Sequence, residues 1–240
     1  MHCKIPSFLN SCDRAVSLTF DVAIIGGGHN GLTTAAYLAR GGLKRVVVLE
    51  KNSAVGGAAL TEEFHPGFRN SVAAYTVSLL NPKVISDLEL KRFGLEIVLR
   101  PASNFWPVDD KRSLIMRVGT AARQEAIAQF SKHDAARLPA YDQAIERAAD
   151  VLRNLILQTP PNVGGGLRAL ISGGRIGRRM LGLNIDDQRL VADLFTKSAT
   201  DFLDRWFEND IVKGALAFDG IVGAYASPST PGTGYVLLHH

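Results

Sequence analysis

Cysteine is nearly absent from this sequence, and its scarcity excludes thiol and zinc chemistry. Only Cys3 and Cys12 occur among 240 residues, and they form neither a CxxC redox pair nor a zinc cluster. The chain closes on His239 and His240, and two adjacent terminal histidines do not by themselves make a metal site. We therefore expect no redox-active thiol pair and no bound metal.

Long apolar runs and dense basic tracts are also missing. A membrane-spanning helix needs about 18 or more consecutive apolar residues, and even residues 211–226 are interrupted by Lys213 and Asp219. The formal net charge is +4, from 27 basic and 23 acidic residues, and it is not concentrated in one segment. Nucleic acid requires a clustered basic surface. We expect no transmembrane segment and no nucleic acid partner.

The bulk composition is that of an ordinary globular protein. Apolar residues make up 46% of the chain and charged residues 21%, which is enough to form one sizeable core. The first 19 residues include Pro6 and Asp13 and lack the apolar segment of a secretory signal. We expect residues 1–19 to be a disordered leader.

The patterned part of the chain begins with a strand, a helix and a second strand. Residues 20–25 and 45–49 are short apolar runs that are typical of buried strands. Between them, mostly small apolar residues recur at the spacing of one helix face: Leu32, Ala35, Ala36 and Ala39. Gly41 and Gly42 then supply a stop. The pattern predicts a β–α–β unit whose helix lies close to the sheet.

The rest of the chain changes from mixed to helical patterning. The first segments are predicted to be a helix over residues 82–93 and extended pieces at 96–100 and 113–117. Residues 109–111 are predicted to form a hairpin tip between these two strands. Residues 120–157 then become strongly helical, with a restart at Ser131. Pro160 ends this run, and Ser198 has the spacing of a cap for a later helix.

A glycine motif lies where the first strand meets the first helix. Residues 26–31 read GGGHNG, which matches the GxGxxG pattern of a dinucleotide-binding turn. In such a turn the first glycine permits the bend, the second lets the backbone approach a pyrophosphate, and the third lets the helix lie close to the strand. The helix N-terminus adds N–H groups and partial positive charge. The residues expected at the cofactor are Gly26, Gly27, Gly28, Asn30 and Gly31.

Glu50 and the residues after it distinguish between cofactors. Glu50 ends the second strand, where its carboxylate can accept hydrogen bonds from the adenosine ribose and would repel the 2′-phosphate of NADP. Further on, a second glycine pair resembles the second phosphate-contacting loop of FAD enzymes, which NAD domains usually lack. We therefore favour FAD over NAD; the alternative is that the pair is only a flexible turn. The expected contacts here are Glu50, Lys51, Gly56, Gly57 and Ala58.

These features predict an α/β fold in two parts. Residues 20–118 are expected to form a Rossmann-type FAD-binding region with associated strands, and residues 119–240 part of a mixed, largely helical substrate or cap domain. Within the second part, residues 151–185 hold five arginines and no acid. Such a segment is either a helical cap over a substrate cavity, which we favour, or a surface for peripheral membrane contact.

Longer stretches resemble a known family. Residues 21–67, with GGAALTEEFHPGF after Glu50, are similar to the phytoene desaturase and carotenoid isomerase family of flavoproteins. Within this family, SLLNPKVISDLELKRFGLEIVLRP and SPSTPGTGYVLLHH extend the resemblance over nearly the whole chain after residue 20. The resemblance implies an FAD-dependent oxidoreductase that acts on an unidentified apolar or amphipathic substrate. It also implies the mitochondrial matrix for a eukaryotic chain and the cytoplasm for a bacterial one.

The sequence departs from the wider family at two points. Ala58 and Ala59 stand where related enzymes often have an arginine, so amine oxidase chemistry does not carry over. Family members are more than twice as long, and their late Gly-Asp segment has no counterpart before His240. We therefore expect an N-terminal fragment in which no catalytic residue can be named. The alternatives are a redox-neutral flavin isomerase and a non-catalytic truncated or protein-interaction chain.

Overall fold

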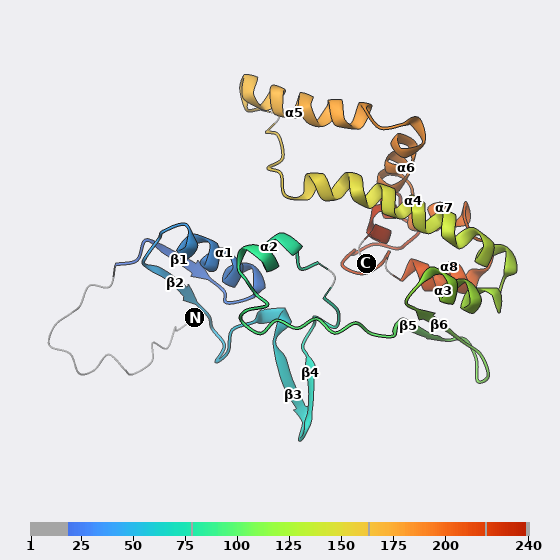
Figure 1. Cartoon of the computed structure of the whole chain (residues 1–240), viewed down its shortest axis with the longest axis horizontal. Coiled ribbons are helices and arrows are strands. Elements are labelled where there is room, and N and C mark those ends of the chain that lie inside the picture. Colours follow the sequence, from blue (N-terminus) through green and yellow to red (C-terminus); the bar gives the residue numbers. More distant parts are fainter. Residues whose placement is uncertain (1–18, 78, 163, 219, 239–240) are drawn as a thin grey trace. The chain divides into compact units, whose positions relative to one another are not determined.

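The computed structural model describes residues 19–77, 79–162, 164–218 and 220–238 (Figure 1). The chain forms two compact units, one ending at Ile97 and the other beginning at Val98. The predicted leader, apart from Thr19, lies outside the described residues, as do His239 and His240. The division predicted at residues 118 and 119 stays a prediction about the domains of the protein.

The first unit is built around a small parallel sheet. Its elements are β1 (Val22–Ile25), α1 (His29–Arg40), β2 (Val46–Leu49), the 3₁₀ turn η2 (Gly57–Ala59), β3 (Thr61–His65), β4 (Phe68–Ser71) and α2 (Pro82–Asp87). β1 and β2 pair in parallel, with Val22 opposite Val46 and Ile25 opposite Leu49. Helix α1 connects them and ends at the C-cap Gly41. The predicted β–α–β unit is confirmed.

The remainder of the first unit consists of a hairpin and a short helix. Strands β3 and β4 pair antiparallel from Thr61 opposite Ser71 to the turn. Asn81 caps α2 by accepting a hydrogen bond from the backbone N–H of Lys83 at 2.9 Å. The helix is shorter than the predicted residues 82–93, because Glu89 has a φ of +52°, which an α-helix cannot accommodate.

The second unit begins with an antiparallel hairpin and continues in helices. Its elements are β5 (Ala102–Pro107), β6 (Ser113–Arg117), α3 (Thr120–Ala128), α4 (Lys132–Ile156), α5 (Gly166–Leu181), α6 (Ile185–Thr196), α7 (Ala199–Asp204), α8 (Asp210–Ala217) and the 3₁₀ turn η3 (Gly234–Leu238). As predicted, Ser131 and Ser198 cap α4 and α7, each through a side chain that accepts a backbone N–H.

The hairpin corrects one prediction. Residues 113–117 form a strand as expected, but their partner is β5 and not residues 96–100, which are not in a strand. The reason lies in the turn, where Asp109 accepts the backbone N–H groups of Lys111 and Arg112 at 2.9 and 2.8 Å. A tip at this position places Pro107 opposite Ser113. The pairing then runs to Ala102 opposite Arg117, the last residue of β6, so β6 is already paired along its length with β5 and not with residues 96–100.

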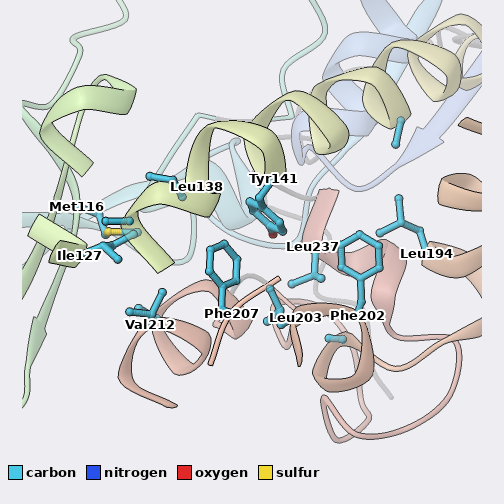
Figure 2. Close-up of a cluster of buried hydrophobic side chains, with 14 of the residues drawn as sticks. Met116, Ile127, Leu138, Tyr141, Leu194, Phe202, Leu203, Phe207, Val212 and Leu237 are labelled. Carbon is cyan, nitrogen blue, oxygen red and sulfur yellow. The ribbon is translucent and has the colours of Figure 1, made fainter. Parts of the chain in front are cut away.

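A continuous apolar core lies in the second unit (Figure 2). Side chains from β6, α3, α4 and α6 through η3 meet there, and the labelled members are Met116, Ile127, Leu138, Tyr141, Leu194, Phe202, Leu203, Phe207, Val212 and Leu237. Tyr141 lies near the centre, with its ring 5.0 Å from that of Phe207 and 6.5 Å from that of Phe202. Burial of these side chains is the main stabilising contribution to this unit.

Helix α5 differs from the other helices of the second unit in what it exposes. Leu167, Leu170 and Leu181 are 74%, 71% and 78% exposed. Arginine is the only charged residue type in this helix. Among the described helices, none is long and apolar enough to cross a membrane.

Candidate functional site

The first glycine loop continues the parallel sheet and then starts α1. The backbone N–H of Gly26 donates to the carbonyl of Leu49 at 2.8 Å, which extends the pairing of β1 with β2 by one residue. Gly26 has a φ of +100°, a conformation that only glycine adopts without strain. The carbonyl of Gly28 accepts the N–H of Leu32 at 2.9 Å and so begins the helix. The loop is therefore a sharp strand-to-helix turn.

Gly31 and Gly27 are glycines because the surrounding protein leaves no room for a side chain. A Cβ atom on Gly31 would lie 2.1 Å from the carbonyl oxygen of Gly26 and 3.4 Å from Cγ2 of Ile24. A Cβ atom on Gly27 would lie 2.8 Å from Cγ1 of Val55. The close approach of α1 to the loop requires a glycine at position 31, and the close approach of the segment after β2 requires one at position 27.

Gly28 is different, because the described protein does not require a glycine there. Its φ of −74° and ψ of 176° suit any residue. Among the described residues, a Cβ atom at this position would meet only Cα of Gly57, at an ordinary contact distance of 3.9 Å. The space beside Gly28 is thus open at the N-terminus of α1, as a loop that closely approaches a ligand requires.

Glu50 connects the end of β2 to the first glycine loop. Its Oε2 accepts the backbone N–H of Gly27 at 2.7 Å, and its Oε1 accepts the backbone N–H of Asn52 at 3.0 Å. The hydrogen bonds from Asn52 and from Gly27 lower the pKa of the Glu50 carboxyl, and the nearby charge of Lys51 acts in the same direction. Each carboxylate oxygen keeps a further lone pair that can accept another donor.

The second glycine loop lies directly against the first. The backbone N–H of Gly56 donates to the carbonyl of Gly27 at 2.8 Å, and Gly28 and Gly56 form an isolated parallel bridge. Gly56 and Gly57 have φ values of 133° and 55°, and a Cβ on Gly57 would lie 3.0 Å from Cα of Gly28. The carbonyl of Ala58 accepts two backbone N–H groups from the chain after β4. The two loops therefore form one structure.

The N-terminus of α1 is left without the capping that most other helices have. No described side chain caps it and its first turn has no acidic residue. Five other helices start at an Asn or Ser whose side chain accepts a backbone N–H: Asn81, Ser131, Asn184, Ser198 and Asn209. The N–H groups of the first turn of α1 are thus directed at the open space beside Gly28. Such an arrangement fits the pyrophosphate of a dinucleotide.

The structure brings together most of the residues expected at this site. Gly26, Gly27, Gly28, Glu50, Gly56 and Gly57 are joined by the contacts above. Asn30 and Lys51 have exposed side chains beside them. Sequence reasoning missed Val55, which packs over Gly27, and the N–H of Asn52, which orients Glu50. The signal for Val55 was a large apolar residue among the small and polar residues 51–57.

A second cluster of polar side chains lies in the other unit. Among the described residues, His133, Asp134 and Glu208 place three ligand-type atoms within 4.8 Å of one another. Asp134 is fully buried, and its two oxygens accept the backbone N–H groups of Glu208 and Asn209, each at 2.9 Å. These bonds fix the chain just before α8, so the carboxylate already has a structural role. The absence of a metal stays a prediction.

Comparisons with known proteins identify the domain that contains these loops. The model of the NAD(P)-binding Rossmann-like domain family matches residues 24–88. Pyridine nucleotide-disulfide oxidoreductase domain-containing protein 2 from Rattus norvegicus is 36% identical over 256 residues, covering 99% of this chain and 42% of that protein. One of the polypeptides of limonene dehydrogenase from Castellaniella defragrans is 41% identical over 126 residues, covering 49% of this chain and 21% of that protein.

A solved structure supports the fold. An engineered triple mutant of putrescine oxidase aligns with 90% of this chain and 40% of its own, with a TM-score of 0.51 and 18% sequence identity. At this identity the likeness shows the fold alone. The chain has the predicted Rossmann-type α/β fold, and it spans about two fifths of the rat protein. Over nearly its whole length it is related to pyridine nucleotide-disulfide oxidoreductase domain-containing protein 2.

Proposed function

We propose that this chain binds FAD and that the protein is an FAD-dependent oxidoreductase acting on an apolar or amphipathic substrate. The observation that carries the proposal is the open position of Gly28 at the uncapped N-terminus of α1. The protein does not need a glycine there, whereas a pyrophosphate does. The paired loop at Gly56 and Gly57 supports FAD over NAD, as does the resemblance of residues 21–67 to the phytoene desaturase and carotenoid isomerase family.

Each residue of the site has a defined part in this proposal. The backbone N–H groups from Gly28 to Gly31, with Asn30 among them, bind the pyrophosphate at the N-terminus of α1. Gly26 and Gly27 shape the loop, because their N–H groups already donate to Leu49 and Glu50. Glu50 accepts the ribose hydroxyls through the lone pairs that Gly27 and Asn52 leave available. Gly56, Gly57 and Ala58 form the second phosphate contact, and Lys51 lies at its edge. We assign no catalytic residue to this chain.

The flavin, when bound, supplies the chemistry by accepting a hydride or an electron pair from the substrate. The chain's own residues bind and orient the adenosine half. The name of the bacterial relative refers to limonene, a hydrocarbon, and this supports an apolar substrate. Oxidoreductase function in the rat protein's name supports the reaction class. Reduction of bound flavin by the substrate without oxygen would separate an oxidoreductase from a redox-neutral isomerase.

The test compares glycines that differ in what surrounds them. Gly28→Ala should keep the fold but weaken FAD binding by at least about tenfold, since the added methyl group occupies the phosphate position. Gly31→Ala should disrupt the loop itself, because its Cβ would lie 2.1 Å from the Gly26 carbonyl oxygen. Gly174→Ala adds a methyl group in open space and serves as the control. FAD affinity by calorimetry and amide exchange in β1 measure the two effects.

Two outcomes would contradict the proposal. If Gly28→Ala binds FAD as tightly as the unchanged chain, the pyrophosphate does not lie at Gly28. If the chain binds NAD but not FAD, the second glycine loop has been misinterpreted.

Peripheral membrane contact through residues 151–185 is a secondary proposal. The exposed leucines of α5 support it, as does the absence of acidic residues between Asp150 and Asp186. We expect the chain to sediment with anionic but not with zwitterionic vesicles, and Leu170→Asp to reduce this binding. Equal binding to both kinds of vesicle, or to neither, would contradict it. The resemblance supports the mitochondrial matrix as the location if the protein is eukaryotic, and we expect the cytoplasm if it is bacterial.

A further inference from the structure

A groove in the second unit is separate from the glycine loops. It has a volume of about 370 Å³ and is lined by residues of α4, α6 and α7 and by two residues that follow α7. All of these residues lie between Arg137 and Trp206, within the second unit. The groove therefore needs its own explanation.

Basic side chains outnumber acidic ones around this groove. Its four arginines are Arg137, Arg147, Arg189 and Arg205. Its two acids are Asp186 and Asp193, and Asp187 pairs with Arg147 beside them. Four arginines thus stand against three aspartates, which leaves a formal excess of positive charge. A concave surface with such an excess attracts anions.

Arg137 is the arginine with donors left for a ligand. Its guanidinium lies over the ring of Trp206, with 5.7 Å from Cζ to the ring centroid, and Nη2 donates to the carbonyl of Arg205 at 3.3 Å. No carboxylate among the described residues forms an ion pair with it, whereas Arg147 and Arg205 each pair with an aspartate. A guanidinium has five N–H donors, so most of those on Arg137 can reach a carboxylate or phosphate.

The floor of the groove is apolar and fixed by the core. Phe202 and Ala144 are 1% and 3% exposed, and Phe202 belongs to the cluster in Figure 2. Leu190 and Trp206 complete the floor and are partly buried. The ring of Trp206 packs edge-on against Tyr141, with 5.7 Å between ring centroids and an interplanar angle of 77°. Phe202 and Ala144 thus support the floor from below, and Leu190 and Trp206 are the apolar side chains that a ligand can contact.

We propose that this groove binds a small amphipathic anion, that is, a carboxylate or phosphate carried on an apolar body. The anionic group accepts hydrogen bonds from Arg137, and the apolar body lies against Trp206 and Leu190. The site consists of residues that take no part in the proposed binding of FAD, so either proposal can fail without the other.

The test uses matched amphiphiles and matched arginine variants. Octanoate and octyl phosphate, each below its micelle concentration, distinguish a carboxylate ligand from a phosphate ligand, and octylammonium and acetate are the controls. Calorimetry on the full chain should detect binding of at least one octyl anion and of neither control. Arg137→Gln should weaken that binding at least tenfold. Arg112→Gln should leave it unchanged, because Arg112 also lies over an aromatic ring, that of Phe130 at 5.9 Å, but outside the groove.

Fluorescence gives a second measurement that does not depend on Arg137. Trp106 and Trp206 are the two tryptophans of the chain, and Trp106→Phe leaves Trp206 as the only one. Nε1 of Trp106 has no hydrogen-bond partner among the described residues, so this change removes no bond. Octanoate or octyl phosphate should then change the emission of Trp206. Absence of binding by both anions, equal binding of octylammonium, or unchanged affinity in a folded Arg137→Gln chain would overturn the proposal.

Discussion

The two units of this chain obtain their geometry in different ways. Among the described residues, every fully buried apolar side chain lies in the second unit, from Leu114 onward. In the first unit, Ile25 of β1 and Leu49 of β2 are 89% and 54% exposed. Its loops are instead positioned by backbone hydrogen bonds and close glycine contacts. Truncating a buried apolar side chain should therefore act mainly on the second unit, whereas the first unit should be sensitive to a methyl group added to one of its loop glycines.

The largest expected effect is on the core of the second unit. Phe202 is 1% exposed, and Phe202→Ala removes a ring that contacts several core side chains. We expect the free energy of unfolding to fall by about 3 to 5 kcal/mol, from lost burial and the cavity that remains. Both tryptophans, Trp106 and Trp206, lie in this unit. Urea unfolding followed by tryptophan fluorescence therefore reports on this unit alone.

The matched control is a phenylalanine in the first unit. Phe64 lies in β3 and is 72% exposed. Phe64→Ala should change the stability of the first unit, followed by amide exchange in β3 and β4, by no more than about 0.5 kcal/mol. Equal losses from Phe64→Ala and Phe202→Ala would mean that the two units do not differ as proposed.

A smaller effect is expected at the buried carboxylate of the second unit. Asp134→Asn keeps one acceptor oxygen but turns an amide N–H₂ toward one of the two backbone N–H groups that Asp134 binds. Leaving that N–H without a partner should cost about 1 to 3 kcal/mol in the same urea experiment. His133→Gln, at a half-exposed neighbour, should cost less. Stabilisation of the unchanged chain by added Zn²⁺ would instead indicate a metal site.

The difference between the units also explains what the sequence could predict. The sequence was sufficient to predict the β–α–β unit, the glycine loop and Glu50, because each depends on backbone geometry within a short stretch of residues. Glycine patterns cannot, however, distinguish a glycine required by the fold from one left open for a ligand. Gly31 and Gly28 look alike in sequence, and only the distances to Gly26 and Gly57 separate them.

In the second unit, local signals predicted helix starts but not tertiary contacts. The caps at Ser131 and Ser198 could be predicted from sequence, because each capping hydrogen bond joins the serine side chain to a backbone N–H only three residues later. The partner of β6 was predicted wrongly, since residues 96–100 have an extended pattern while the turn at Asp109 sets the register. The contact of Asp134 with Asn209 joins residues that are 75 positions apart. Nothing in the pattern around either residue indicates it.

The finest test of the first unit concerns the ionisation of Glu50. Hydrogen bonds from the N–H groups of Asn52 and Gly27 hold the pKa of its carboxyl below the ordinary 4.5. A carboxyl whose folded pKa is lowered stabilises the fold fully above its unfolded pKa, and this contribution is lost as the pH falls through the folded pKa. The pH-dependent shift of the NMR amide signals of Gly27 and Asn52 should therefore have its midpoint below pH 4.5.

Glu50→Gln should remove this titration and weaken FAD binding by about tenfold or more, because a charged acceptor is lost at the ribose and a bond to the loop is weakened. Glu63→Gln is the matched control, since the Glu63 carboxylate also accepts a glycine N–H, that of Gly67 at 2.7 Å, but in the β3–β4 hairpin. The control should keep both the titration and the affinity. If Glu50→Gln binds FAD as tightly as Glu63→Gln does, Glu50 only holds the two loops together and does not contact the ribose.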